Sequence, residues 1–238
     1  MDRNEKARQE FAEKMTPPMR QILVGIPSDD VVKANFAMAF AAMSFYSGLM
    51  KIPLAFANQK GSMLPRNRNN LAKDAKILNC SHLFQIDSDL SFPPQALHRL
   101  LSHKQPVVGA TYARRSQPHD NLAVPLNKQP VQKASGLTAV DRLPTGMLPI
   151  DMEVFEKIKK PYFRFPTTEE QEGLPEGRID GEDYYLCDAI RQAGYDVLLD
   201  VELSFDLVHW GEAGWRLRED GGDPKAPRFE LVELQSAV

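Results

Sequence analysis

Residues 83–97 read LFQIDSDLSFPPQAL, a short apolar run followed at once by an Asp-Ser-Asp triplet. The run from His82 to Ile86 has the length and composition of a buried strand. Two carboxylates two residues apart, just past such a strand, repel each other unless a cation or a proton neutralises them. Asp87 and Asp89 therefore predict a divalent-metal site, and the alternative is a solvated turn that caps a helix starting near Ser91.

Short apolar runs alternate with helical stretches on both sides of this triplet, which is typical of a wound α/β fold with a largely parallel sheet. The expected strands are 21–26, 54–57, 82–86, 106–110, 197–201 and 205–208, and the expected helices are 30–50, 67–79, 91–103, 151–159 and 182–193. Residues 113–145 are polar and contain several prolines and glycines, so we expect an insertion beside the site.

Ligands of open α/β sheets bind outside the carboxyl ends of the strands. The polar residues that follow the apolar runs are therefore the candidates for a site, and they are Pro27, Ser28, Asp29, Asp87, Asp89, Thr111, Tyr112 and His209. Hard oxygen ligands such as carboxylates suit Mg²⁺ or Mn²⁺, which leave positions open for substrate phosphates.

Composition narrows the classes of partner. The 238 residues carry a formal charge of −3, so the broad basic field of non-specific nucleic-acid binders is missing and we expect no nucleic-acid partner. Two cysteines, Cys80 and Cys187, lie in apolar patterns and are expected to be free and buried. The longest apolar stretch, residues 31–50, is interrupted by polar residues, so we expect a cytoplasmic protein without a transmembrane segment, with peripheral membrane contact left open.

Six segments, in this order, resemble the family 2 type glycosyltransferases of the GT-A fold: ILVGIPS (22–28), RNRNNLAKDA (66–75), FQIDSDLSFPPQALHRLL (84–101), PVVGATYARR (106–115), PTGMLPIDMEVFEKI (144–158) and DGEDYYLCDAIRQAGYDVLLDVELSFDLVHWG (180–211). The resemblance implies a single Rossmann-like GT-A domain at 21–211, with a mostly parallel central sheet flanked by helices. A helical or flexible extension at 1–20 and a C-terminal tail at 212–238 would flank it.

The resemblance also implies residues for the nucleotide-sugar donor. Pro27, Ser28 and Asp29 would contact its base and ribose. Arg66, Arg68 and Asn69 would approach its phosphates from a helix start, where charge and helix dipole act together. The alternative for each arginine is a solvated basic helix face.

Asp87, Asp89 and His209 are the metal site that the resemblance implies. Asp87 would contact the ribose or a metal-bound water, Asp89 would bind the metal directly, and His209 would complete the site. An imidazole suits manganese, although a lone histidine is more often structural.

The acceptor side of the resemblance rests on residues 181–183. Asp183 would be the catalytic base that removes the proton of an acceptor hydroxyl, with Glu182 beside the donor. The alternative is that both acids favour the positive end of their helix. Gly146 would let the backbone approach the donor sugar and the acceptor.

These observations predict a metal-dependent glycosyltransferase that moves a sugar from a nucleoside diphosphate to an acceptor hydroxyl with inversion, using Mn²⁺ or Mg²⁺. A glycan, a lipid-linked molecule or a small molecule would be the acceptor. No Q-x-x-R-W motif of processive synthases is present, which favours single-sugar transfer. Two alternatives remain: a non-catalytic nucleotide or carbohydrate binder, and a sugar nucleotidylyltransferase, which the sequence GIPSDD disfavours because that class opens with G-x-G-x-R.

Overall fold

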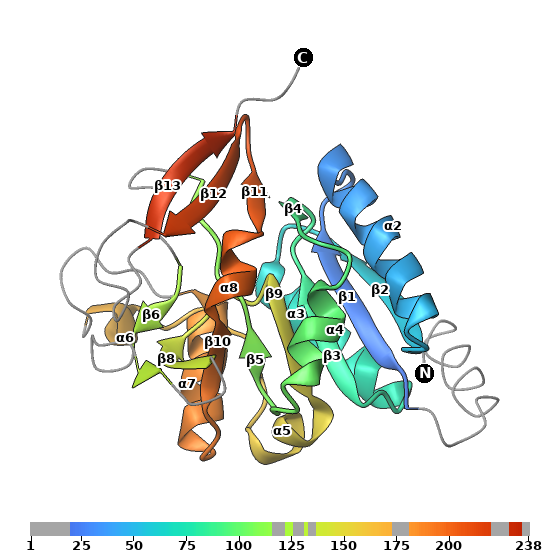
Figure 1. Cartoon of the computed structure of the whole chain (residues 1–238). Coiled ribbons are helices and arrows are strands. Elements are labelled where there is room, and N and C mark those ends of the chain that lie inside the picture. The colour runs from blue at the N-terminus through green and yellow to red at the C-terminus, as the bar shows by residue number, and fades with distance from the viewer. Residues whose placement is uncertain are drawn as a thin grey trace.

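The core of the fold is a four-stranded sheet of order β2-β1-β3-β9 (Figure 1). The computed structural model describes residues 20–115, 122–125, 131–132, 137–172, 181–219 and 229–234. β1 (Ile22–Ser28) pairs in parallel with β2 (Leu54–Lys60) and with β3 (His82–Ile86), and β9 (Met147–Asp151) runs antiparallel to β3. The expected α/β class and the mostly parallel character of this sheet are confirmed.

A second sheet continues the first across β9. It contains β5 (Val108–Gly109), β10 (Val197–Asp200), β8 (Leu137–Arg142) and β6 (Val124–Pro125) in that order, and β7 (Val131–Gln132) also pairs with β8. The amide of Ala110 donates to the carbonyl of Met147 at 3.1 Å, so the chain around β5 lies beside β9.

The prediction that residues 113–145 are only an insertion was wrong for β8. Leu137 to Val140 are all buried, and they pair with β10. The run is short, lies between polar segments and does not alternate, because both of its faces are covered.

A third, antiparallel sheet brings β11 against the two residues that follow the Asp-Ser-Asp triplet. Its order is β13 (Phe229–Leu234), β12 (Gly214–Glu219), β11 (Val208–Trp210) and β4 (Leu90–Ser91). The described residues beyond 211 thus form strands that extend β11, where the sequence suggested a tail. The predicted helix cap at Ser91 was also wrong, because Ser91 lies in β4 and its hydroxyl oxygen accepts a hydrogen bond from Trp210 Nε1 at 2.8 Å.

Two sets of helices cover the two faces of the sheet (Figure 1). α2 (Ala34–Leu49) and α4 (Ala96–Ser102) pack on one face, in the same apolar cluster as Ile22 and Val24 of β1. α3 (Leu64–Ile77), α5 (Met152–Lys157) and α7 (Glu182–Gln192) pack on the other, in the cluster that contains Leu23. Successive side chains along β1 point to opposite faces of the sheet, so Ile22 and Val24 point toward α2 and α4, and Leu23 points toward the other three helices.

Three smaller features complete the described fold. α6 (Thr168–Glu172) and α8 (Val201–Phe205) are short. α8 begins at Val201, where the sequence suggested the end of one strand, and ends at Phe205, where it suggested the start of the next. Cys80 and Cys187 are buried and free, as expected. Within the described ranges, no helix has the length and apolar character that crossing a bilayer requires.

α3 lies unusually close to β1. A Cβ on Gly25 would come within 3.0 Å of the Leu71 side chain, so glycine permits this approach. Arg68 precedes Leu71 by three residues and shares its helix face. This close packing places Arg68 near the carboxyl ends of β1 and β3.

Candidate active site

A cavity of about 380 Å³ opens at the carboxyl ends of β1 and β3. The first turn of α7 and strand β11 close its other sides. It brings together most of the residues expected to form a site, namely Pro27, Ser28, Asp29, Arg68, Asp87, Asp89, Glu182, Asp183 and His209. Five separate segments of the chain thus meet where an open α/β sheet binds its ligands.

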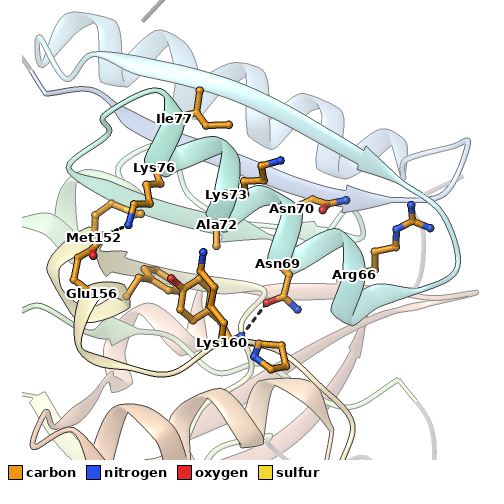
Figure 2. Close-up of a pocket in the computed structure, with 13 residues that line it drawn as sticks. Arg66, Asn69, Asn70, Ala72, Lys73, Lys76, Ile77, Met152, Glu156 and Lys160 are labelled. Carbon is orange, nitrogen blue, oxygen red and sulfur yellow. Dashed lines mark hydrogen bonds and ion pairs between the residues drawn. The ribbon is translucent and has the colours of Figure 1, made fainter. Parts of the chain in front are cut away.

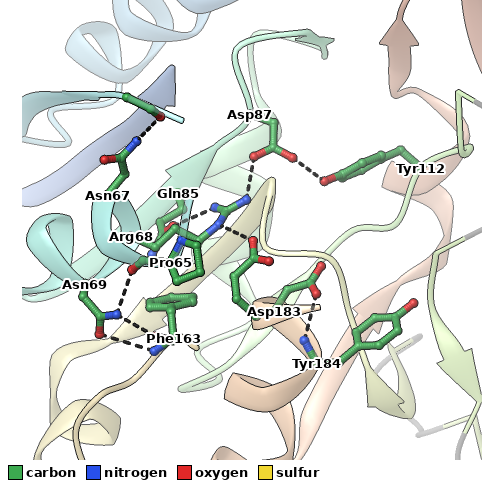
Figure 3. A network of polar contacts seen from close by, with 12 residues as sticks. Pro65, Asn67, Arg68, Asn69, Gln85, Asp87, Tyr112, Phe163, Asp183 and Tyr184 are labelled. Atoms are coloured by element: carbon green, nitrogen blue, oxygen red, sulfur yellow. Dashed lines mark hydrogen bonds and ion pairs between the residues drawn. The ribbon is translucent and has the colours of Figure 1, made fainter. Parts of the chain in front are cut away.

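Arg68 organises the floor of this cavity (Figure 3). Its side chain is 4% exposed and donates three hydrogen bonds, to Glu182 Oε1 at 3.1 Å, Gln85 Oε1 at 2.7 Å and Asp87 Oδ1 at 2.9 Å. Burial alone would lower the pKa of Arg68, but Asp87 and Glu182 outweigh that effect and raise it. Each of the three nitrogens donates one of these bonds, so the side chain fixes the positions of Gln85, Asp87 and Glu182.

Asp87 is held by two donors. Arg68 binds Oδ1, and the hydroxyl of Tyr112 donates to Oδ2 at 2.7 Å. Burial would raise the pKa of Asp87, but the charge of Arg68 and the bond from Tyr112 together keep it below its ordinary value. Asp87 is therefore an anion of fixed orientation rather than a solvated turn residue.

Gly146 lies against this pair. A Cβ at this position would overlap the Asp87 carboxyl group and the Tyr112 hydroxyl, and the amide of Asp87 donates to the Gly146 carbonyl at 3.1 Å. The position admits only glycine, because the backbone comes this close. The sequence-based expectation of a close backbone approach at Gly146 agrees with this geometry, although the neighbours here are side chains.

Nε2 of His209 faces Oδ1 of Asp89, and no hydrogen-bond donor of another described residue reaches this oxygen. Nδ1 of His209 lies 2.7 Å from the carbonyl oxygen of Ala113 and must donate to it, since a carbonyl only accepts. In the neutral ring Nε2 then carries a lone pair, and it lies 3.4 Å from Asp89 Oδ1. Among the described residues, Asp89 Oδ1 is buried and has no hydrogen-bond partner.

Two facing acceptors need a proton or a cation between them. Their chemistry fits a metal ion, because metal-binding histidines usually donate their other ring nitrogen to a carbonyl or carboxylate. Within the described part of the chain, however, no three His, Cys, Asp or Glu side chains converge as a metal site. Asp87 accepts hydrogen bonds from Arg68 and Tyr112, so Asp89 and His209 are the two members of the expected three-residue site that face each other.

Asp183 lies on the opposite wall, in the first turn of α7. In the described structure its carboxylate contacts its own helix start, where Oδ1 accepts from the amide of Tyr184 at 2.9 Å. Burial, reinforced by the negative charge of Glu182, raises the pKa of Asp183 to about 7. A carboxyl group with this pKa beside a cavity can accept a proton near neutral pH.

Ser28 and its neighbours form the wall expected to contact the nucleoside. The hydroxyl of Ser28 donates to the carbonyl of Asp29 at 2.9 Å and accepts from Asn58 Nδ2 at 2.7 Å. Asn58 also reaches the carbonyl of Ile26. Asn58 thus tightens the end of β1, while Asp29 is exposed at the rim.

The structure does not bring Arg66 or Asn69 to this cavity. Both line a separate groove of about 800 Å³ beside α3 and α5 (Figure 2). Asn69 donates to the carbonyl of Phe163 at 2.7 Å and accepts from the amide of Tyr162 at 2.9 Å, so it fastens the 161–163 loop to α3. Arg66 is two residues from Arg68 and so lies on nearly the opposite side of the helix.

Three residues of the site were missing from the sequence-based assignment. Tyr112 was noted only as a strand-end residue, although it binds Asp87. Gln85 is a polar residue inside an apolar strand, which is a signal that a buried partner exists. Arg115 lines the cavity and forms an ion pair with Asp89 at 2.8 Å, and it has no signal beyond following Tyr112.

Comparisons with known proteins show a similarity of fold only. No protein-family model matches the chain, and no curated protein matches it. The chain is similar to the crystal structure of A197 from STIV, with a TM-score of 0.55 and 15% identity over 92% of this chain and 96% of that one. A structure from Bacillus anthracis described as a glucose-1-phosphate thymidylyltransferase in complex with a sucrose has a TM-score of 0.34 and 10% identity over 72% of this chain and 93% of that one, which carries no argument.

Arg68→Met should destabilise the protein by about 3–5 kcal/mol, because Asp87 and Glu182 would lose their buried counter-ion. The loss should shrink at pH 5, where the carboxyl groups can hold protons. Denaturant unfolding measures both effects. Arg66→Met is the matched control, since it removes an exposed arginine from the same helix, and equal unfolding free energies of the two variants would contradict the assigned role of Arg68.

Asp183→Asn should stabilise the metal-free protein at pH 8 and have little effect at pH 4. The pKa of Asp183 is higher in the folded state, about 7, than the ordinary 3.8. Its contribution to stability is therefore full below pH 4 and is lost as the pH rises through 7. Asparagine does not ionise, so the variant should gain on the order of 2 kcal/mol over wild type at pH 8.

Thermal unfolding in chelator, followed from pH 4 to pH 8, would measure this difference. Asp188→Asn is the control on the same helix, because Asp188 forms an ion pair with Arg142 at 2.6 Å and its loss should not stabilise. An Asp183→Asn difference that stays constant with pH would rule out the raised pKa.

Proposed function

We propose that this chain is a metal-dependent transferase that moves a sugar from a nucleoside diphosphate to an acceptor hydroxyl, with inversion at the anomeric carbon. The observation that carries the proposal is the facing pair of acceptors, Asp89 Oδ1 and His209 Nε2, in one cavity with Asp183. The two acceptors need a proton or a cation between them, and the proposal assigns a divalent cation to this place and the role of base to Asp183.

The donor side of the proposal uses Asp89 and His209 to hold Mn²⁺ or Mg²⁺. Such ions are commonly bound through one or two protein groups and complete their shell with substrate phosphates, so two protein ligands suffice when a diphosphate is present. The ion would offset the negative charge of the diphosphate. Pro27, Ser28 and Asp29 form the adjoining wall, where the base and ribose would lie.

The acceptor side uses Asp183. The acceptor oxygen forms a bond to the anomeric carbon, the bond from that carbon to the diphosphate oxygen breaks, and the hydroxyl proton passes to the Asp183 carboxylate. A single displacement from the face opposite the leaving group inverts the configuration. The raised pKa supports this role, because a base with a pKa near 7 accepts a proton more readily than an ordinary aspartate does.

Arg68 and Gly146 have positioning roles in this proposal. Arg68 fixes Asp87 and Glu182, so the negative groups keep their separation around the cavity. Gly146 leaves room for Asp87 and Tyr112. A non-catalytic binder and a sugar nucleotidylyltransferase are the two alternatives. A base with a raised pKa beside an open cavity favours a reaction over binding alone.

Nucleoside diphosphates should bind tightly only with a divalent metal. Without it the diphosphate would face Asp87 and Asp89 directly. A calorimetric panel of nucleoside diphosphates, run in Mn²⁺ and in chelator, should show at least tenfold tighter binding with the metal for one or more of them. Asp89→Asn should abolish this difference, and His209→Ala should reduce it.

The control for the metal experiment is Asp200→Asn, which changes an aspartate that binds Arg99 and does not line the cavity. Its nucleotide binding should keep the full metal dependence in any protein that remains folded. Equal affinity in Mn²⁺ and in chelator for the wild-type protein would remove the metal from the proposal.

Asp183→Asn should lower the transfer rate by roughly 10² to 10⁴, the usual contribution of general-base catalysis. Asparagine has nearly the same volume but does not accept the proton. Donor affinity should be unchanged, because the residue lies across the cavity from Asp89. Donor hydrolysis with Mn²⁺ gives a rate before the acceptor is known, and product NMR gives the configuration. A retained configuration, or wild-type turnover by the variant, would leave Asp183 as a helix-start residue only.

A further inference from the structure

Arg115 is the cation that the described structure puts on Asp89. Its Nη1 lies 2.8 Å from Asp89 Oδ2, while the other oxygen of Asp89 faces His209. The Arg115 side chain is 49% exposed and that of Asp89 is 19% exposed. The single negative charge of Asp89 is thus balanced by a side chain that solvent can reach, while Oδ1 has no hydrogen-bond partner among the described residues.

The Arg115 and Asp89 pair also lies between two cavities. A second cavity of about 690 Å³ adjoins the first, and Arg115, Leu122 and His209 line both. The first cavity alone is near the lower limit of about 300 Å³ for ligand pockets. A nucleoside diphosphate that carries a sugar would occupy both cavities. The Arg115 side chain would then either block this ligand or contact it.

Arg115 differs from Arg68 in how firmly it is held. Arg68 is buried and has three acceptors. Arg115 is half exposed, and the ion pair found for it in the described part of the chain is the one with Asp89. Ion pairs that water can reach contribute little to stability. The guanidinium can therefore exchange Asp89 for a better anion at little cost.

We propose that Arg115 is an exchangeable counter-ion, which neutralises Asp89 in the ligand-free protein and moves to the donor diphosphate when a divalent metal takes its place. This inference rests on the proposed function. The guanidinium fork matches the oxygens of a phosphate group better than a point charge does. Movement of Arg115 away from Asp89 would also join the two cavities.

Two effects of opposite sign follow from this exchange. The metal alone must displace Arg115, so Arg115 weakens metal binding in the absence of a diphosphate. With metal bound, the freed guanidinium adds a contact to the diphosphate and strengthens its binding. Metal and diphosphate are therefore coupled through one side chain, and the coupling is reciprocal.

Arg115→Met tests both effects in one variant. By calorimetry, Mn²⁺ alone should bind this variant roughly fivefold more tightly than wild type. Inorganic pyrophosphate, titrated into the Mn²⁺-saturated protein, should bind it roughly tenfold more weakly. Pyrophosphate carries the diphosphate without a base or a sugar, so the result does not depend on which donor is correct.

Two further variants serve as controls. Lys33→Met removes one positive charge at the rim of the second cavity, where Lys33 Nζ donates to the Gly211 carbonyl at 2.9 Å, and neither affinity should change by more than about twofold. Arg115→Lys keeps the charge and should bind Mn²⁺ like wild type, while pyrophosphate affinity should recover only in part, since lysine lacks the fork.

The outcomes separate the two proposals. If wild type and Arg115→Met take up Mn²⁺ with equal affinity, or bind pyrophosphate equally, the exchange at Arg115 is refuted and the metal-dependent function stands. If neither protein takes up Mn²⁺, whether alone or with pyrophosphate, the metal-dependent function fails and the exchange falls with it.

Discussion

The buried guanidinium of Arg68 is the constraint on which the rest of the site depends. It joins α3, β3 and the start of α7 through Gln85, Asp87 and Glu182. The carboxylates of Asp87 and Glu182 would repel each other in a dry interior if no cation were present. With Arg68 among them, Asp87 stays ionised, while Asp183, which has no such bond, has a raised pKa. Arg68 therefore keeps Asp87 ionised, whereas burial raises the pKa of Asp183.

Two arginines of the same cavity illustrate how surroundings decide what a charge can do. Arg68 is closed off from water, so breaking its bonds would cost the full desolvation of several partners. Arg115 is half exposed, and water can replace whatever it releases. The first is suited to a permanent structural role and the second to an exchange. The identity of the residue alone would not separate these two roles.

Much of this architecture could be predicted from the sequence, and the wrong predictions have identifiable causes. The expected bounds of β3 are those observed, and α7 ends one residue early, because both elements follow a clear apolar period and end at clear signals. The error at Arg66 was one of helical phase: Arg68, Leu71 and Ala75 share the face that packs on the sheet, and Arg66 does not.

Other features depend on contacts that no local pattern contains. β4 has two residues and exists because β11 pairs with it, so Ser91 reads as a helix cap until its partner is known. The short, fully buried run of β8 was likewise taken for part of a loop. The bond from Tyr112 to Asp87 and the ion pair of Arg115 with Asp89 are both tertiary contacts, and only their place after a strand could have indicated them.

The pairing of β4 with β11 has a consequence for the order in which the protein is made. Ser91 and Trp210 are 119 positions apart, and the amide of Trp210 also donates to the Asp89 carbonyl at 2.8 Å. Synthesis proceeds from the N-terminus, and the first strands can form while the rest is still on the ribosome. Until residues 208–210 have been made, Asp89 has neither its backbone anchor nor His209 beside it. A nascent chain with β1 to β3 already folded would therefore lack the proposed cation site, which is complete only once β11 has been made.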